Sequence, residues 1–551
     1  MRCRFHLYLA WCGVVLSYSA AAAESPPTAE WARLWNSPAN HDDMGELVTV
    51  DPAGLIYTAG SSYIPSDVGE DFFLLCHDVD GNLLWFRTWG GAGNDHASGL
   101  ENAGPGEVVL CGYSWDDGQP SLAVVKFDDT GTVVWERLHE LDGVFWGSPP
   151  VMTVDAQLNI LVAAGEGGDY RVVKFSGDGI LLWSQSYDTD NHDFDVPTGI
   201  TTDGAGAVYV TGWTGSPSAF VTVKFSSSGS FLWDQSEPGD IGSVFSPSRV
   251  AITPDGDVVV SGSTESVCGT FQARTWKLTP DTGVVSWIQI FPPDPCWSVH
   301  VRDLAVDSAG NTVVIGFGAI ESSDGHFQTL KYSPDGTLLW HQAFDGPGDS
   351  TDEPAALEID GAGNVYVAGY STFTPQNRDF AGVKYSPAGQ ELWSLHWSGP
   401  FGTNDSARDI ALHPLGDLVV TGSAYDPAHQ EEAVTIYFHQ DNPASVSPKG
   451  RSGQGASLSA ARVVPVPASL SAGTLPAIHF RLETSGPVRL RIHDVGGDLV
   501  RTLAIPFCAQ GENRVVWDRE NGQGRPVGPG VYFFTLESGA TSTTGRISLT
   551  R

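Results

Sequence analysis

One tryptophan, following a short apolar stretch, recurs through most of the chain at intervals of 48 to 54 residues. Its copies are Trp35, Trp85, Trp135, Trp183, Trp233, Trp287, Trp340 and Trp393. Between successive copies the same four strand-like segments follow in the same order. Four short strands repeated every ~40–50 residues are typical of a β-propeller, in which each repeat forms one blade. The spacing therefore predicts a large all-β ring.

The seventh unit shows the four strands most clearly. Segments 355–359, 365–369, 380–385 and 391–393 are short and apolar-rich, and turn residues separate them. The turn at Ala388-Gly389 places glycine at the second position of a tight hairpin, where φ is positive. We expect this four-stranded antiparallel unit to represent every blade.

The number of copies predicts how the ring closes. The second-strand segment appears eight times, whereas the first fourth-strand segment, 31–35, precedes the first unit. We therefore expect eight blades, with the N-terminal strand completing the last one, because closure leaves no exposed sheet edge. Seven blades are the alternative, if the irregular third or fifth unit does not form a blade.

A lysine stands nine residues before the tryptophan in five units. The pairs are Lys126/Trp135, Lys174/Trp183, Lys224/Trp233, Lys331/Trp340 and Lys384/Trp393. A tight hairpin between them would place each lysine directly opposite its tryptophan, where its chain can lie along the indole face. A repeated pair of this kind indicates structure rather than a catalytic array.

The N-terminus and the charge indicate export. Residues 1–23 combine Arg2 and Arg4, a short apolar run and three alanines, which is typical of a signal peptide. Its removal takes away two arginines and no acid, so the net charge of −36 becomes −38. Nucleic acid and anionic membranes are not expected partners, because both need a basic surface. No later apolar stretch is long enough for a transmembrane helix.

Five cysteines remain after residue 23, and no two form a CxxC pair. Cys268 and Cys296 fall in loops on the same face of the predicted ring. A disulfide between them suits an exported protein, although the sequence leaves the connectivity open. Cys76 and Cys111 lie in predicted strands and are expected to be buried as small apolar residues.

The loops between second and third strands, together with the connections between blades, vary most in sequence. Variable loops on a rigid framework are where binding sites usually lie. This face collects the tryptophans that we select as candidate ligand contacts: Trp115, Trp146, Trp213, Trp297 and Trp397. Exposed aromatic rings can stack on sugars or anchor a protein, whereas the alternative role is to cover the ends of the blades.

Acidic residues on the same face form the candidate metal site. Asp188, Asp190, Asp193 and Asp195 fall within eight residues and could hold Ca²⁺, although no EF-hand spacing is present. Asp95, Asp352 and Asp405 recur just before a strand, where aspartate commonly accepts backbone N–H bonds. The sequence contains no known catalytic motif, so we predict no catalytic residue. Apart from the candidate Ca²⁺, it indicates no cofactor.

The repeat resembles the bacterial SBBP-type β-propeller family. The residues that carry the resemblance are 379–385 (DFAGVKY) with Leu392-Trp393, followed by Asp405-Ser-Ala407 and 419–422 (VVTG). It covers residues 31–440 and implies an exported propeller without implying a reaction. The family is associated with seven blades, whereas this sequence counts eight.

The remainder divides into a linker and a small domain. The propeller is expected over 24–440, a Gly/Ser/Pro-rich flexible linker over 441–460 and an Ig-like β-sandwich over 461–551. The last domain resembles that of the flagellar hook-capping protein and the C-terminal sorting domains of type nine secretion. Residues 488–494, 499–503 and 515–518 carry the resemblance, which implies export or surface attachment.

Together these features predict a secreted or cell-surface, non-enzymatic binding or scaffold protein of bacterial type. Its variable-loop face would bind a glycan or a protein, and the C-terminal domain would serve export or attachment. The alternatives are an extracellular enzyme acting on polysaccharide and a structural surface component. The sequence identifies neither the ligand nor the oligomeric state.

Overall fold

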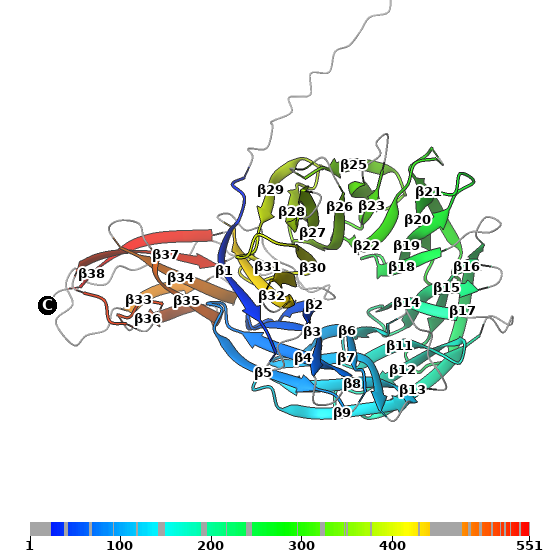
Figure 1. The fold of residues 1–551 in the computed structure, drawn as a ribbon, viewed down its shortest axis with the longest axis horizontal. Coiled ribbons are helices and arrows are strands. Elements are labelled where there is room, and N and C mark those ends of the chain that lie inside the picture. The colour runs from blue at the N-terminus through cyan, green and yellow to red at the C-terminus, as the bar shows by residue number, and fades with distance from the viewer. Residues whose placement is uncertain are drawn as a thin grey trace, which may run out of the picture.

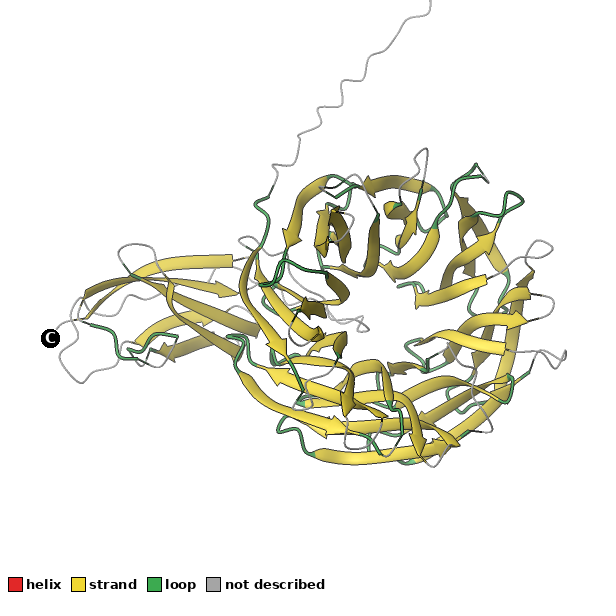
Figure 2. Ribbon diagram, viewed as in Figure 1, coloured by secondary structure: helices red, strands yellow, loops and turns green. Residues whose placement is uncertain are grey.

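The chain is described from a computed structural model in which the regular elements are all β-strands (Figure 2). The description covers residues 24–549 except 38–41, 65–68, 92, 117–118, 142–148, 189–194, 216–217, 239–244, 295, 320–324, 347, 349–350, 375–376, 428–429, 441–476, 483–485, 495–498, 509–510, 518, 523–524, 529 and 539–540. The predicted signal peptide and linker lie outside it. Within these residues no helix is long and apolar enough to cross a membrane.

Eight four-stranded antiparallel sheets form the larger part of the molecule, and Figure 1 shows them arranged in a ring. The first four are β2 (Asp43–Val50), β3 (Ile56–Ile64), β4 (Gly69–His77), β5 (Leu83–Trp89); β6 (His96–Gly104), β7 (Glu107–Asp116), β8 (Gln119–Asp128), β9 (Val133–Glu140); β10 (Val151–Val154), β11 (Ile160–Glu166), β12 (Asp169–Phe175), β13 (Leu181–Tyr187); and β14 (Asp195–Thr202), β15 (Val208–Gly215), β16 (Ser218–Phe225), β17 (Phe231–Pro238).

The other four sheets follow in the same order. They are β18 (Phe245–Ile252), β19 (Val258–Glu265), β20 (Phe271–Leu278), β21 (Val285–Phe291); β22 (His300–Val306), β23 (Thr312–Gly318), β24 (His326–Tyr332), β25 (Leu338–Phe344); β26 (Asp352–Ile359), β27 (Val365–Thr374), β28 (Asn377–Tyr385), β29 (Glu391–Trp397); and β30 (Asp405–Leu412), β31 (Leu418–Asp426), β32 (Gln430–His439) with β1 (Thr28–Trp35). The third and fifth units, whose sequences are irregular, also form four-stranded sheets.

The N-terminal strand lies beside the last one. β1 pairs antiparallel with β32, with Trp35 opposite Ala433. A cluster that contains Trp31, Ile56, Val419 and Tyr437 joins the first sheet to the eighth. The arrangement is consistent with a propeller in which the N-terminal strand supplies the outermost strand of the last blade.

The repeated tryptophan holds neighbouring sheets together through the turn glycine of the next sheet. The indole N–H of Trp135 donates to the carbonyl of Gly177 at 2.9 Å, and the ring covers Gly179. Gly179 has φ +74°, and a Cβ there would lie 2.6 Å from the Trp135 ring. Repeated tryptophans make the same contact with Gly131, Gly229, Gly283, Gly336 and Gly389. At Gly81 the ring belongs to Trp31, so Trp31 rather than Trp35 is the structural equivalent in β1. Glycine therefore serves both the positive φ and the close approach of the ring.

The predicted pairing of lysine with tryptophan is present, but the lysine's charged end lies elsewhere. Lys174 is directly opposite Trp183 despite a bulge at the turn. Its Nζ lies 2.8 Å from the carboxylate of Asp155, in the turn between the first two strands of the same sheet. Lys331 and Asp307 form the same contact at 2.9 Å. A carboxylate compensates these buried ammonium groups. Lys224 differs, because its Nζ donates to the carbonyl of Pro280 at 2.7 Å and lies over the ring of Tyr209.

The C-terminal domain is a small sandwich of two sheets. A four-stranded sheet contains β35 (Leu499–Cys508), β34 (Gly486–His493), β37 (Gly530–Ser538) and β38 (Thr541–Leu549), and β33 (Ala477–Leu482) pairs with β36 (Gly511–Val516). Alternate residues such as Phe480, Leu490 and Phe534 enclose the fully buried Trp517. This agrees with the predicted Ig-like sandwich and with a core position for Trp517.

Candidate functional site

The order of strands gives the propeller two unlike faces. Hairpins between the first and second strands, and between the third and fourth, lie on one side, which we call the turn face. Loops between second and third strands and the connections between sheets lie on the other, which we call the variable-loop face. Ligand sites usually occupy variable loops on a rigid framework, so this face is the candidate site.

The tryptophans predicted as ligand contacts are less exposed to solvent than expected, where the structure describes them. Trp115, Trp213, Trp297 and Trp397 are half-buried, and Trp146 lies outside the described residues. The ring of Trp397 packs 5.1 Å from that of Phe380, at the edge of the core between the seventh and eighth sheets. These rings contribute to packing between strands, so each offers only part of its surface to a ligand.

Two other aromatic side chains are exposed where the seventh sheet passes to the eighth. Phe401 is 40% and Tyr425 39% exposed. Asn404 joins the loops that carry them, because its carbonyl accepts the Tyr425 amide at 2.9 Å and its side-chain oxygen accepts the Arg378 amide at 3.1 Å. We call Arg378, Phe401, Asn404 and Tyr425 the 7/8 patch. The sequence does not mark Tyr425 as a ligand contact, because this residue belongs to an ordinary alternating strand pattern. Its position at the end of β31, next to a variable loop, is the only sequence signal for such a role.

The recurring aspartates that precede a strand do accept backbone N–H bonds. Asp352 Oδ2 accepts from Gly346 at 2.7 Å, and Asp405 Oδ2 accepts from Gly399 at 2.6 Å. Asp95 and Asp43 make the equivalent bonds with Gly91 and Ser37. Burial, followed by the nearby negative charge of Asp379, raises the pKa of Asp405 to about 6. These carboxylates connect neighbouring sheets on the variable-loop face.

The predicted calcium ligands are only partly described. Asp190 and Asp193 lie outside the described residues. Asp188 is half-buried, and Asp195 is buried with its amide donating to the carbonyl of Gly168 at 2.6 Å. The calcium site at 188–195 therefore stays a prediction.

Three other residues on the same face bring metal-ligating atoms together. Among the described residues, His326, Asp345 and Asp352 place one ligand atom each within 4.8 Å of one another. His326 begins β24, Asp345 follows β25, and Asp352 begins β26 in the next sheet. Asp352 is one of the recurring aspartates that precede a strand, whereas no local sequence pattern marks His326 or Asp345.

The predicted cysteine pair also lies on the variable-loop face. The structure places the Sγ atoms of Cys268 and Cys296 2.05 Å apart, at disulfide distance. Cys76, Cys111 and Cys508 are buried and have free thiols. The bond connects the loop after β19 with the connection that leads from β21 to β22.

The turn face of the first and eighth sheets carries the Ig-like domain. Arg489 in β34 forms a buried ion pair with Asp417, which lies just before β31. Arg491 adds a second, more exposed pair with Glu30 of β1 at 2.7 Å. The two domains therefore meet through charged side chains on the side opposite to the 7/8 patch.

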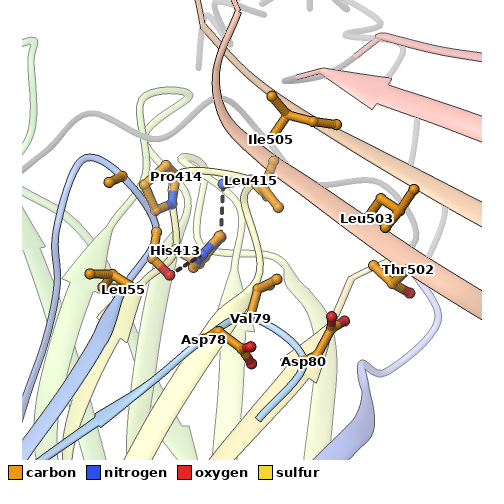
Figure 3. A pocket seen from close by; sticks show the side chains of 12 residues that line it. Leu55, Asp78, Val79, Asp80, His413, Pro414, Leu415, Thr502, Leu503 and Ile505 are labelled. Carbon is orange, nitrogen blue, oxygen red and sulfur yellow. Dashed lines mark hydrogen bonds between the residues drawn. The ribbon is translucent and has the colours of Figure 1, made fainter. Parts of the chain in front are cut away.

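A pocket of about 200 Å³ lies in this interface (Figure 3). His413 and Leu415 line it from the eighth sheet, Val79 and Asp80 from the first, and Leu503 from β35. His413 accepts the amide of Leu415 at 3.2 Å, and its other ring nitrogen contacts the carbonyl of Gly54. Burial, with the positive charge of Arg489, lowers the pKa of His413 to about 4. The pocket is smaller than typical ligand sites and is best understood as a gap between the domains.

Comparison with family models supports the Ig-like assignment of the C-terminal domain. Residues 471–542 match the model of the FlgD Ig-like domain. No curated protein matches the chain. The molecule is therefore an all-β chain with propeller-like sheets and a C-terminal FlgD-type Ig-like domain.

Among solved structures, similarity is distant. Quinohemoprotein alcohol dehydrogenase from Comamonas testosteroni has 12% identity and a TM-score of 0.46, covering 79% of each chain. The β-propeller domain of the Trilobed protease from Pyrococcus furiosus has 10% identity and a TM-score of 0.40, covering 63% of this chain and 95% of that domain. PorZ, a surface component of the type-IX secretion system of Porphyromonas gingivalis, has 12% identity and a TM-score of 0.29, covering 92% of this chain and 74% of its own.

Proposed function

We propose that this chain is an exported, surface-associated and non-enzymatic binding protein that recognises a glycan through the 7/8 patch. The observation that supports this most directly is the separation of the two faces. The Ig-like domain contacts the turn face of the first and eighth sheets through Arg489 and Arg491, whereas Phe401 and Tyr425 are exposed on the variable-loop face. A bound tail domain therefore leaves the patch accessible.

The chemistry of the 7/8 patch suits a sugar. Phe401 and Tyr425 offer apolar ring surface, on which the C–H face of a pyranose can stack. Asn404 lies in the same passage as Phe401, and its carbonyl accepts the Tyr425 amide. Its side-chain oxygen accepts the amide of Arg378, whose guanidinium lies over the ring of Tyr370 at 4.8 Å. Amide and guanidinium groups supply the directional hydrogen bonds that select among hydroxyl groups. Aromatic surface beside such groups favours a glycan over a purely apolar ligand.

The propeller and tail have distinct parts in this proposal. We propose that the eight sheets are eight blades of one closed ring of the SBBP repeat type, with β1 as the closing strand. The pairing of β1 with β32 and the cluster around Trp31 support closure. The FlgD-type domain would serve export or attachment, as the sorting-domain resemblance implies, and the predicted signal peptide would direct the chain out of the cytoplasm.

An enzyme acting on polysaccharide is the second candidate, and one observation favours it. The pKa of Asp405 is raised to about 6 by burial and by Asp379, which is a useful range for a general acid. Yet Asp405 is only 2% exposed, and it accepts the Gly399 amide as its counterparts do in other sheets. The same geometry in several sheets favours a structural part for this carboxylate.

A glycan-array screen of the exported chain, residues 24–551, tests the binding proposal. We expect a specific set of glycans to bind, and Phe401→Ala and Tyr425→Ala to weaken that binding at least tenfold. Phe231→Ala is the matched control, because Phe231 is an aromatic residue at the start of β17 near the turn face and, at 52%, is more exposed than either patch residue. Equal losses in all three variants, or no specific glycan for folded protein, would contradict the proposal.

The same screen separates the alternatives. Shortening of a bound polysaccharide that disappears in Asp405→Asn would support the enzyme. Self-association of the chain without a glycan would support the structural surface component, and size-exclusion chromatography with light scattering measures it directly.

A further inference from the structure

The His326, Asp345 and Asp352 group combines one imidazole with two carboxylates. His326 Nδ1 lies 3.6 Å from Asp345 Oδ1 and 3.6 Å from Asp352 Oδ2. These distances are too long for hydrogen bonds. Two ligands bound tetrahedrally to one zinc ion at ~2.1 Å each would lie ~3.4 Å apart. The spacing therefore fits a shared cation better than direct contact.

The buried member of the group lacks enough partners in the described structure. Asp352 is 0% exposed, and its Oδ2 accepts the Gly346 amide, whereas no described residue bonds its Oδ1. His326 Nδ1 and Ser371 Oγ also have no hydrogen-bond partner among the described residues. A buried carboxylate is costly unless a positive charge or several donors compensate it. The Oδ1 atoms of the equivalent Asp43 and Asp405 also have no partner among the described residues, so His326 and Asp345 are what mark this position. A cation bound between them and Asp352 would supply that compensation.

Gly346 packs closely against the buried side of the group. A Cβ on Gly346 would lie 1.9 Å from Ser371 Oγ and 3.0 Å from Asp352 Oδ1. Asp345, its neighbour, is 57% exposed, so the group is open to solvent on one side. An ion could therefore reach the group from the variable-loop face and keep an open coordination position there.

The next passage between sheets shows that the fold does not itself require the other two ligands. Asp405 makes the same amide bond as Asp352, but Asp379 and Ser398 occupy the positions of His326 and Asp345. The buried aspartate is common to both passages. The next passage also holds an imidazole, but there His396 contacts Asp379 directly at 3.1 Å, whereas His326 stays 3.6 Å from both of its carboxylates. The wider spacing around His326 therefore distinguishes this passage.

We propose that His326, Asp345 and Asp352 bind a divalent transition-metal cation of the Zn²⁺ type on the variable-loop face. Imidazole with carboxylates is a donor set that suits Zn²⁺, whereas Ca²⁺ prefers six or more oxygen atoms. Three protein ligands leave a fourth position for water or for an oxygen atom of a ligand. The proposal goes beyond the glycan site, because it concerns a different passage and holds whether or not a glycan binds.

Metal titration of the untagged chain, residues 24–551, tests the site. After treatment with EDTA and gel filtration, we expect one Zn²⁺ per chain by equilibrium dialysis and elemental analysis, and a tetrahedral-type absorption spectrum with Co²⁺. Asp345→Asn should weaken Zn²⁺ binding at least tenfold, and its exposed position should leave folding intact. His326→Gln should weaken binding further and change the Co²⁺ spectrum.

The matched control is Asp335→Asn, which removes an exposed carboxylate from the turn face of the same sheet. It should bind Zn²⁺ as the unmodified chain does, and circular dichroism should show all variants folded. Zinc binding that Asp345→Asn leaves unchanged would overturn the proposal. So would the absence of stoichiometric zinc, or equal competition by Ca²⁺.

Discussion

Arg489 of the Ig-like domain and Asp417 of the last propeller sheet form a buried ion pair, and each side chain is 1% exposed. Tyr437 donates to Asp417 Oδ2 at 2.6 Å, and His439 lies 2.8 Å from Oδ1. Burial alone would raise the pKa of Asp417, but the Arg489 charge and these hydrogen bonds hold it well below its usual value. The tail domain is therefore attached to the propeller through a buried carboxylate, Asp417, both of whose oxygen atoms have partners.

Removal of this arginine should weaken the attachment of the two domains. Arg489→Ala leaves Asp417 buried without its cation, which typically costs about 3–5 kcal/mol. We expect a lower Tm and a larger radius of gyration by small-angle X-ray scattering. Arg491→Ala is the comparison, because its pair with Glu30 is less completely buried and its loss should cost less than the loss of Arg489. Equal effects of the two variants would contradict the assignment.

Replacing two different turn glycines by alanine should separate two contributions to the free energy of unfolding: backbone strain at positive φ and the clash with a tryptophan ring. Gly179 and Gly256 both have positive φ, but only Gly179 faces an indole, that of Trp135 at 2.6 Å. Gly256→Ala should cost about 1–2 kcal/mol from backbone strain alone. Gly179→Ala should cost ~1–3 kcal/mol more, because Trp135 must move. Denaturant unfolding of both variants measures the difference, and equal costs would mean that the ring contact contributes nothing.

Asp405 should make stability depend on pH in a defined direction. Its folded pKa of about 6 is raised from 3.8, first by burial and then by Asp379. The folded chain therefore holds this proton more tightly, and the stabilisation present below pH 4 is lost as the pH rises through 6. Asp405→Asn is neutral in both states. Its Tm relative to the unmodified chain should therefore rise by ~2 °C or more between pH 4.5 and pH 7.5; an unchanged or falling difference would refute this.

The cysteines should fall into two classes of reactivity. Burial raises the pKa of Cys76 and of Cys111 to about 12, so neither thiol should react in the folded state. Cys268 and Cys296 are exposed and should react only after reduction. Mass spectrometry after iodoacetamide treatment should show no label on native protein and two labels after mild reduction. Labelling of Cys268 without reductant would show that the bond is not formed.

The regular parts of the fold followed from local sequence. Tryptophans spaced by about 50 residues, glycines in tight turns and the lysine opposite Trp183 predicted four-stranded units and their register, because strand alternation and turn conformation depend on neighbouring residues. The ion-pair partner of the lysine could not be predicted from local sequence. Its carboxylate partner, Asp155, comes from another turn and was not recognisable by spacing.

The candidate sites depended on tertiary structure to a greater degree. The sequence predicts Trp397 as a ligand contact, but its ring packs on Phe380. Tyr425 is exposed because β31 ends beside the passage that carries Phe401. The local sequence around an aromatic residue in an alternating strand is the same whether its ring is buried or exposed to solvent. Only the placement of the neighbouring loops distinguishes the two cases.

The sequence by itself determined the strand units, their turns and the presence of a separate Ig-like tail, since these arise from periodicity and turn chemistry within each segment. The tertiary structure alone decided that Arg489 meets Asp417 and that His326 lies beside Asp352 in the next sheet. The physical reason is that such pairs form only when whole sheets and domains pack together. The free energies of packing and desolvation that stabilise them act between segments far apart in the chain, and the local sequence of one segment does not specify its partner.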